Sequence, residues 1–276
     1  MEKLLEGMGK SLAEFSLDYL KDIQNENIRL TRDIHDAIEA PLPSEYILAR
    51  KQLNAKQKEA YKAIVEHIKL NKAGIFFVDG PGGTGKTFLY CALYAKMRLM
   101  NKIVLPTATS GIAASGLPNG RTAHSRFKLP IDHNASLTCD VPRQGSLAAL
   151  LKETALIIWD EAPMANKANI HALDLLLKDV CNSKLSFGGK VVVFGGDFRQ
   201  VFPVVPHKTQ SEAIDASLVS SPLWPAFIKF HLEENMRARE DPDFASFLLQ
   251  LGDGRLQKNE HGFVSLPPEI LKPIND

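Results

Sequence analysis

The sequence predicts an α/β fold in which helices cover both faces of a parallel sheet. Two observations support this prediction. Short runs of continuous apolar residues recur along the chain, and segments with the 3.6-residue periodicity of helices separate them. A strand that is apolar along its whole length is buried on both faces, which is typical of a parallel sheet between two layers of helices.

The first 50 residues predict a helical extension ahead of the sheet. Apolar residues recur there at helical spacing, at Leu12, Phe15, Tyr19 and Ile23. Pro41 and Pro43 interrupt this pattern and favour a loop. We therefore expect one or two amphipathic helices within residues 1–50, followed by a loop.

Strands and helices alternate from residue 51 onward. We expect strands at residues 75–78, 103–105, 156–159, 191–194 and 228–232. We expect helices at residues 54–70, 86–100, 170–180 and 242–251. Asn54 is a good N-cap for the first of these helices. Residues 127–150 are rich in proline, polar and small residues and predict a small insertion. The chain thus divides into the extension, an α/β lobe at residues 51–256 and a tail at residues 257–276.

The composition excludes several classes of protein. Of the 276 residues, 45% are hydrophobic and 24% are charged, which are ordinary globular proportions and exclude a disordered chain. No apolar run approaches the roughly 18 residues needed to cross a bilayer, and the N-terminus has no signal-peptide core. The three cysteines lie far apart without paired spacing, so we expect neither a zinc knuckle nor a disulfide framework, and a reducing intracellular compartment is favoured.

The net charge of +1 hides an uneven distribution. Residues 51–152 contain 15 basic and 5 acidic groups, a net charge of +10, while residues 1–50 carry −4 and residues 153–276 carry −5. A basic middle region suits a polyanionic ligand. Lysine-rich, solvated helix faces explain the same count, and charge alone favours that second interpretation.

The segment after the first predicted strand has the residue pattern of a phosphate-binding loop, G-x-x-x-x-G-K-T. Its residues are Gly80, Pro81, Gly82, Gly83, Thr84, Gly85, Lys86 and Thr87. Glycines allow backbone N–H groups to curl around phosphate oxygens, and the following helix presents its positive end to the same anion. We expect Lys86 to neutralise the β and γ phosphates and Thr87 to offer its hydroxyl to Mg²⁺.

A pair of carboxylates follows the third predicted strand. Residues 156–159 are followed directly by Asp160 and Glu161. The carboxyl end of a parallel strand is where such sheets bind ligands, so we expect this pair beside the phosphate loop. One acid can hold the metal while the other handles a proton. We therefore predict that Asp160 holds Mg²⁺ and that Glu161 orients and deprotonates the attacking water.

The fourth predicted strand is followed by a glycine pair and a polar segment, residues 195–200. Gln200 is a candidate to sense the γ-phosphate or to position the water, as glutamines do in other nucleotide hydrolases. Asp197 is a candidate for an outer partner of the same site. A plain polar turn remains an alternative for this segment.

Together these three motifs resemble motifs I, II and III of superfamily-one helicases. Residues 53–57 resemble the glutamine motif that binds adenine, and residues 232–237 resemble motif IV. Residues 109–114 and 120–127 resemble motifs Ia and Ib. The set is similar to the petite-integration-frequency (Pif-type) 5′→3′ DNA helicases. This resemblance implies a RecA-like P-loop NTPase fold for the lobe, with ATP and Mg²⁺ as cofactors.

The resemblance also narrows the branch and suggests the context of the protein. Residues 160–164 and 121–127 are most similar to the plant and Helitron-transposon branch. The family resemblance implies single-stranded DNA as partner, a nuclear location, and work in DNA repair, recombination and telomere maintenance. No membrane partner is implied, and the oligomeric state stays open.

The resemblance assigns roles to further residues. Gln57 would bind adenine, and Arg237 would be an arginine finger on the γ-phosphate. The residues that would contact phosphates and sugars of single-stranded DNA are Ser110, Gly111, His124 and Ser125. These roles have alternatives, because an isolated histidine is often a satisfied core or surface residue. Arg237 could equally pair with Glu233 or Glu234.

Aromatic residues at three positions also leave two interpretations open. Phe127, Phe198 and Phe202 have rings that can stack on bases. Aromatic residues beside strands usually pack in the core, so core packing is the favoured interpretation for most of them.

The family's motor needs two RecA-like lobes that close on ATP. This sequence contains the motifs of the first lobe, and we expect no second α/β unit within residues 252–276. A second lobe or chain is therefore an expected partner. The favoured function is the first motor lobe of a DNA helicase that binds and hydrolyses ATP. The alternative is an ATP- and single-stranded-DNA-binding module with weak catalysis that regulates or competes with a full-length helicase. A small-molecule kinase is disfavoured because no arginine-rich lid segment is visible.

Overall fold

The computed structural model describes residues 34–131, 137–205, 209–239 and 241–266. The helices expected around Leu12 and Ile23 lie outside these residues. Within the described part of the chain, no helix is both long enough and apolar enough to span a bilayer.

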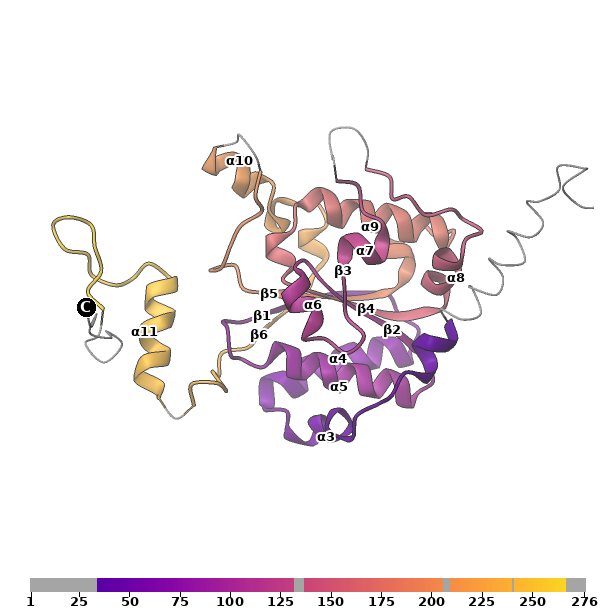
Figure 1. Ribbon diagram of the computed structural model, residues 1–276, viewed down its shortest axis with the longest axis horizontal. Helices are drawn as coiled ribbons and strands as arrows, with labels where there is room; N and C mark the ends of the chain where they lie inside the picture. Colours follow the sequence, from indigo (N-terminus) through magenta and orange to yellow (C-terminus); the bar gives the residue numbers. More distant parts are fainter. Residues whose placement is uncertain (1–33, 132–136, 206–208, 240, 267–276) are drawn as a thin grey trace, which may run out of the picture.

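A parallel six-stranded sheet forms the centre of the molecule (Figure 1). Its strand order is β3-β2-β4-β5-β1-β6. The strands are β1 (Gly74–Asp79), β2 (Ile103–Ala108), β3 (Arg121–Thr122), β4 (Thr154–Asp160), β5 (Val191–Gly196) and β6 (Ile228–His231). Every ladder between neighbours is parallel. The predicted α/β fold is confirmed, and all five predicted strands are present.

The central strands are apolar along their length because helices cover both of their faces. In β1, Ile75 and Phe77 belong to one buried hydrophobic cluster, while Phe76 and Val78 belong to the other. Helices α4 and α5 pack on the second face, and α8 and α9 pack on the first. Successive side chains of a strand point to opposite faces, so a continuous apolar run serves both layers at once.

The helices and short 3₁₀ turns occupy the connections between strands. The longer helices are α3 (Ser44–Gln52), α4 (Ala55–Lys69), α5 (Lys86–Leu99), α8 (Ser146–Glu153), α9 (Lys167–Val180) and α11 (Pro242–Gly252). The shorter elements are α6 (Gly111–Ser115), α7 (Ala123–Phe127), α10 (Gln210–Asp215), η2 (Ala162–Met164), η3 (Ser186–Gly189), η4 (Leu218–Ser220) and η5 (Trp224–Ala226). Residues 34–39 are also helical.

The start of α4 follows from its sequence. The Asn54 side chain accepts a hydrogen bond from Gln57 N, and the Gln57 side chain accepts one from Asn54 N. This reciprocal capping box satisfies two N–H groups at the helix start. Three predicted helices are present with ends within two residues of the prediction, at residues 54–70, 86–100 and 242–251. The fourth, α9, begins three residues earlier than expected.

The loop expected after Pro41 and Pro43 is shorter than predicted, because α3 begins immediately after Pro43. A proline just before a helix start is compatible with the helix, since no intrahelical N–H is lost there. Ala49 of α3 is buried against the cluster that contains α5. Tertiary packing against α5 therefore extends helical structure into a segment whose prolines suggested a loop.

The segment predicted as an insertion, residues 127–150, contains the first part of α8. Ala148, Leu150 and Leu151 are buried in the same cluster as α9. This helix is therefore part of the layer that covers the sheet.

Candidate nucleotide site

The loop between β1 and α5 has the conformation that a phosphate-binding loop requires. Gly83 has φ +88° and Gly85 has φ +78°, backbone angles that favour glycine. A Cβ at Gly83 would collide with Asn235 Oδ1, and a Cβ at Gly85 would lie 2.5 Å from Gln57 Nε2. The two glycines thus allow the loop to turn and allow the side chains of Asn235 and Gln57 to approach it closely.

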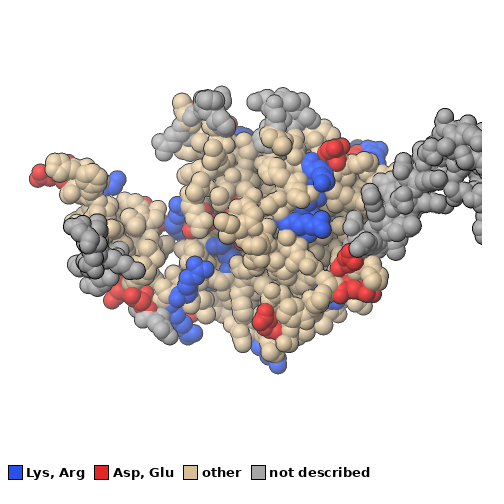
Figure 2. Space-filling model, in the orientation of Figure 1, with Lys and Arg blue, Asp and Glu red and all other residues tan. Residues whose placement is uncertain are grey.

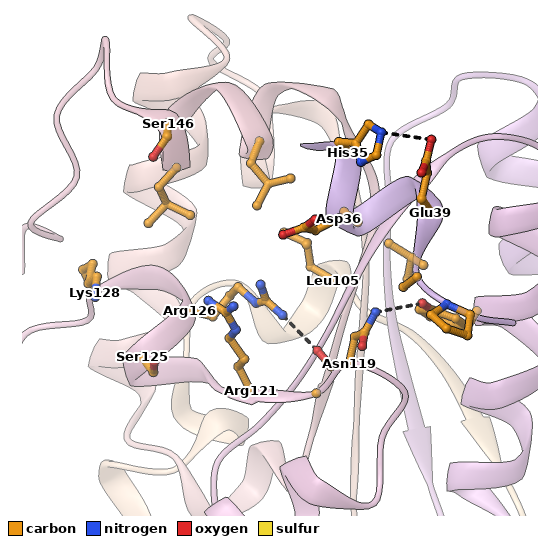
Figure 3. Close-up of a pocket in the computed structure, with 18 residues that line it drawn as sticks. His35, Asp36, Glu39, Leu105, Asn119, Arg121, Ser125, Arg126, Lys128 and Ser146 are labelled. Atoms are coloured by element: carbon orange, nitrogen blue, oxygen red, sulfur yellow. Dashed lines mark hydrogen bonds and ion pairs between the residues drawn. The ribbon is translucent and has the colours of Figure 1, made fainter. Parts of the chain in front are cut away.

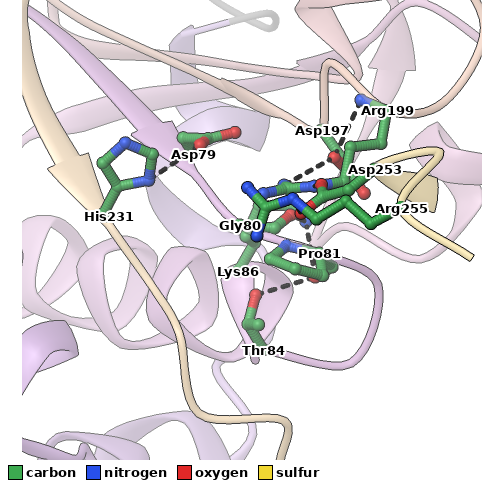
Figure 4. A network of polar contacts seen from close by, with 10 residues as sticks. All are labelled: Asp79, Gly80, Pro81, Thr84, Lys86, Asp197, Arg199, His231, Asp253 and Arg255. Carbon is green, nitrogen blue, oxygen red and sulfur yellow. Dashed lines mark hydrogen bonds and ion pairs between the residues drawn. The ribbon is translucent and has the colours of Figure 1, made fainter. Parts of the chain in front are cut away.

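The Lys86 side chain folds back onto this loop. Its Nζ donates hydrogen bonds to Gly80 O at 2.5 Å and to Pro81 O at 3.2 Å (Figure 4). Burial lowers the pKa of Lys86, while the carboxylates of Asp160 and Asp197 act in the opposite direction. The loop therefore holds a cation at its centre with carboxylates on the neighbouring strand ends.

Asp160 is buried at the end of β4, 8% exposed. Tyr90 Oη of α5 donates a hydrogen bond to Asp160 Oδ1 at 3.4 Å. Desolvation raises the pKa of the Asp160 carboxyl, and a backbone hydrogen bond and the charge of Lys86 partly offset that effect. Burial also raises the pKa of the Tyr90 hydroxyl well above its usual value. A buried carboxylate that is costly to ionise is suited to a site where a cation arrives with the ligand.

Glu161 adopts the left-handed conformation, with φ 53° and ψ 34°. Its carbonyl accepts a hydrogen bond from Thr109 Oγ1 at 2.7 Å, and Trp159 Nε1 donates to the same Thr109 oxygen at 3.0 Å. The Glu161 carboxylate accepts a hydrogen bond from Ser110 Oγ at 2.6 Å. A non-glycine residue in this region of backbone space costs free energy and is held by its surroundings, which is common at functional sites.

The end of β5 connects the site to α11. Asp197 is 7% exposed and accepts hydrogen bonds from Arg199 N at 3.0 Å and Arg199 Nη1 at 3.3 Å. Arg199 Nε also contacts Asp253 Oδ1, at the C-cap of α11, at 2.5 Å. Figure 4 shows this chain of ion pairs beside the phosphate loop. The outer-partner role of Asp197 stays a prediction.

The segment after β6 is bonded to the phosphate loop. Met236 N donates to Gly83 O at 2.9 Å, and Asn235 Oδ1 accepts hydrogen bonds from Arg237 N and Ala238 N, both at 3.0 Å. The segment therefore presents the exposed Arg237 side chain to the cleft. Glu234, one of its predicted alternative partners, instead accepts a hydrogen bond from Asn54 Nδ2.

Just before the loop, Asp79 pairs with His231 across the β1–β6 ladder, with 2.8 Å between Oδ2 and Nδ1 (Figure 4). Its other oxygen, Oδ1, is buried without a hydrogen-bond partner. Burial raises the pKa of the Asp79 carboxyl, and His231 opposes that shift.

These elements enclose one cleft of about 510 Å³. It is lined by Gly82, Gly83, Gly85, Lys86, Thr87, Phe88, Asp160, Glu161, Gly196, Asp197, Gln200, Met236 and Arg237. The structure thus brings together residues predicted for catalysis and metal binding from four separate segments of the chain. Figure 2 shows Lys and Arg side chains beside the ends of β1 and β5 and over α7.

Comparison with known proteins shows the family of the chain. The family model described as PIF1-like helicase matches residues 52–262. The chain belongs to this family. Among curated relatives, the ATP-dependent DNA helicase PIF1 of Trypanosoma brucei brucei is 26% identical over 247 residues, which are 87% of this chain and 23% of that protein. The PIF1 of Candida albicans is 28% identical over 215 residues, 74% of this chain and 23% of that protein.

Two solved structures of PIF1-like helicases show the same fold. The Pif1 helicase from Candida albicans has 25% identity and a TM-score of 0.62, and the match covers 74% of this chain and 45% of that chain. Bacteroides Pif1 bound to single-stranded DNA has 26% identity and a TM-score of 0.59, with 74% and 47% covered. This chain therefore spans about half the length of those solved chains and about a quarter of the two curated relatives. The narrower plant and Helitron-transposon branch stays a prediction.

Gln57, which the PIF1-like resemblance assigns to adenine, lies behind the phosphate loop and is 2% exposed. Its Nε2 donates hydrogen bonds to Thr84 O at 3.0 Å and to Gly85 O at 3.5 Å, and its Oε1 accepts from Asn54 N. The amide therefore supports the loop in this structure. The spacing Asn54-x-x-Gln57 already contained the signal for its role in the helix cap.

The residues predicted to contact DNA lie at the other half of the same sheet edge. Ser110 is the N-cap of α6 and Gly111 is its first residue, two to three positions after β2 ends, and His124 and Ser125 belong to α7 directly after β3. Since β2 and β3 are parallel neighbours, their carboxyl ends lie side by side. Gly111, His124 and Ser125 are exposed.

Ser125 lines a separate cavity of about 840 Å³ between α7, α8 and residues 35–41 (Figure 3). Arg126, which projects into it, is 9% exposed and donates a hydrogen bond from Nη2 to Asn119 O at 3.0 Å. This cavity and the nucleotide cleft share no lining residues among those the structure describes.

Of the three phenylalanines considered for base stacking, two are packed in the protein. Phe127 is fully buried, and Phe198 stacks on Phe77 with 5.0 Å between ring centroids. Phe202 is 43% exposed.

Several contacts of the site were not predicted from the sequence. They include the hydroxyl of Tyr90 on Asp160, the pairing of Asp79 with His231, and the bonds from Arg199 to Asp253 and from Ser110 to Glu161. Each of these contacts joins residues at least 50 positions apart in the sequence. A short sequence pattern therefore could not have indicated them.

Proposed function

We propose that this chain is the ATP-binding and ATP-hydrolysing lobe of a 5′→3′ DNA helicase that contacts single-stranded DNA. The observation that carries the proposal is the cleft in which Lys86, Asp160, Glu161, Gln200 and Arg237 meet at the phosphate loop. These residues supply a cation, two acids, an amide and a second cation, which is the set of groups that phosphoryl transfer to water needs.

Within this proposal the residues divide the chemistry. Lys86 exchanges its bonds to the loop carbonyls for the β and γ phosphates, and Arg237 neutralises charge that develops on the γ-phosphate. Glu161 accepts the proton of the attacking water, and Gln200 orients that water.

The donor atoms at the cleft also fit Mg²⁺. The Thr87 hydroxyl and the Asp160 carboxylate are hard oxygen ligands of the kind this ion prefers, and both residues line the cleft. The described residues contain no group of three or more His, Cys, Asp or Glu that could hold a metal, so further ligands would be phosphate oxygens and water. The ion supplies charge neutralisation on the phosphates when it is bound.

Single-stranded DNA is proposed to cross the ends of β2 and β3. Supporting observations are the exposed polar residues there, the basic side chains over α7, and the relative from Bacteroides that was solved with single-stranded DNA. Phosphate contacts of this kind position a strand without selecting its sequence. We expect a compartment that contains DNA, with the nucleus as the location to examine.

The test is hydrolysis of ATP by the purified chain with and without single-stranded oligothymidylate. The proposal predicts hydrolysis that requires Mg²⁺ and increases when the oligonucleotide is present. Binding of a nucleotide without hydrolysis in either condition would contradict the catalytic part, and equal rates with and without DNA would contradict the coupling to DNA.

A further inference from the structure

The proposed base of the nucleotide site and a proposed DNA contact are bonded to each other. Ser110 Oγ donates to Glu161 Oε2 at 2.6 Å, although the two residues are 51 positions apart. Both side chains are half-buried. Among the described residues, Ser110 is the side chain that donates a hydrogen bond to the Glu161 carboxylate.

Two hydrogen bonds join the backbone segments on either side of this bond. Thr109 N donates to Asp160 O at 3.1 Å, and Thr109 Oγ1 donates to Glu161 O at 2.7 Å. The fully buried Trp159 donates a hydrogen bond from its Nε1 to the same Thr109 hydroxyl. The loops after β2 and β4 are therefore joined, and rotation of the Glu161 side chain is the low-cost movement.

A serine hydroxyl has one proton to donate. Here that proton is on the Glu161 carboxylate, while the Ser110 oxygen accepts Ala113 N at 3.2 Å. A DNA phosphate that accepts the hydroxyl proton must therefore take it from Glu161. The hydrogen bond also holds the Glu161 carboxylate toward the end of β2, so its loss leaves the carboxylate free to rotate toward the cleft that Glu161 lines.

We propose that Ser110 is a positioning residue that couples DNA binding to ATP hydrolysis. Without DNA its hydroxyl restrains the Glu161 carboxylate at the end of β2, and a bound DNA phosphate releases that carboxylate toward the water in the cleft. This inference rests on the proposed function, because it takes Glu161 as the base and Ser110 as a DNA contact.

The first experiment compares ATP hydrolysis by the full chain and its variants, with and without oligothymidylate. Ser110→Ala removes the restraint, so we expect the DNA-free rate to rise about five- to tenfold and the stimulation ratio to fall toward one. Ser110→Thr keeps the hydroxyl and is expected to restore both the low DNA-free rate and the stimulation.

Ser115→Ala is the matched control. Ser115 lies on the same short helix, and its hydroxyl bonds to Ile112 O instead of to the site. We expect its rates to equal those of the unmodified chain. The proposal is overturned if Ser110→Ala lowers the rates with and without DNA by the same factor, or if it changes neither rate.

A second experiment does not require hydrolysis and so separates this inference from the proposed function. Thermal unfolding of Ser110→Ala, Glu161→Ala and the double variant gives the coupling between the two side chains. We expect coupling in the DNA-free protein and its loss when oligothymidylate is bound. Additive effects without DNA, or coupling that persists with saturating DNA, would refute the inference even in a chain that hydrolyses ATP. A chain with no ATPase activity but with DNA-sensitive coupling would refute the proposed hydrolysis, while the release of the Ser110–Glu161 hydrogen bond by DNA would stand.

Discussion

The two halves of the sheet's carboxyl edge hold their functional side chains in different ways. At the ends of β1, β4 and β5, Asp160 and Asp197 are buried, and Lys86 is bonded to its own loop. At the ends of β2 and β3, His124 and Ser125 are exposed on a short helix. Under the proposed function, phosphate chemistry needs donors and acceptors in fixed positions, whereas binding of a DNA strand needs an accessible surface. Ser110 is the residue whose bond joins the two halves.

The largest expected effect is on nucleotide binding by the half of the sheet edge that forms the cleft, at the ends of β1, β4 and β5. The substitution is Lys86→Ala. The variant loses the cation at the centre of the phosphate loop, so we expect nucleotide affinity to fall at least about 30-fold and hydrolysis to disappear. Titration with a fluorescent ATP analogue measures the affinity. The fold should persist, because burial of this ammonium group is itself unfavourable, and unchanged circular dichroism is the control. Retained nucleotide affinity would remove Lys86 from the site.

Glu161→Gln separates binding from chemistry within the same half. We expect hydrolysis to fall about 100-fold or more, while nucleotide affinity stays within about twofold, because the amide keeps the shape but does not accept the proton. Single-turnover hydrolysis together with nucleotide titration gives both quantities. Equal hydrolysis by the variant and the unmodified chain would exclude Glu161 as the base.

Gln57→Ala decides between two roles for a residue that lies behind the cleft. If its main role is to support the loop through Thr84 O, the affinities for ATP and GTP should fall together, by about three- to tenfold. If the amide binds adenine, only the affinity for ATP should fall and the preference for ATP over GTP should disappear. Parallel titrations with both nucleotides distinguish these outcomes.

His124→Ala is expected to have a small effect, confined to the exposed half. We predict single-stranded DNA affinity about two- to threefold weaker, with nucleotide affinity unchanged, because one contact among several is lost on an open surface. Fluorescence anisotropy with labelled oligothymidylate measures this, and Ser115→Ala serves as control. A large loss of nucleotide affinity would show that the two halves are less separate than the geometry indicates.

The smallest effect expected is on stability, for Asp160→Asn. Burial raises the pKa of Asp160 above the ordinary carboxyl value, so the folded state binds this proton more tightly than the unfolded state. The contribution of the group to stability therefore decreases as the pH rises from the ordinary carboxyl pKa through the raised one.

The neutral amide avoids this cost, so the variant should unfold at a higher temperature than the unmodified chain at pH 8. The difference in unfolding temperature should shrink toward pH 4, because the Asp160 carboxyl of the unmodified chain becomes protonated there. Thermal unfolding at both pH values checks this. A variant that is less stable at pH 8 would show that the hydrogen bond from Tyr90 and the charge of Lys86 outweigh the desolvation.

The strands and the phosphate loop could be predicted because their cause is local. Residues 191–194 are apolar throughout and form the first four residues of β5, and the loop from Gly80 to Thr87 is one contiguous motif. The segment around Pro43 could not be predicted in the same way, because α3 is stabilised by burial of Ala49 against α5. Local preference is weak where tertiary packing supplies more free energy.

By itself the sequence determined the α/β fold class, the phosphate loop and the acidic pair at the end of β4. Contiguous patterns carry that information, since periodicity and local turn geometry act over a few residues. The tertiary structure decided which atoms are joined across the sheet edge: Tyr90 to Asp160, Arg199 to Asp253, and Ser110 to Glu161. The order of parallel strands brings these distant residues together, and a hydrogen bond depends on positions accurate to a few tenths of an ångström, which only the packed fold supplies.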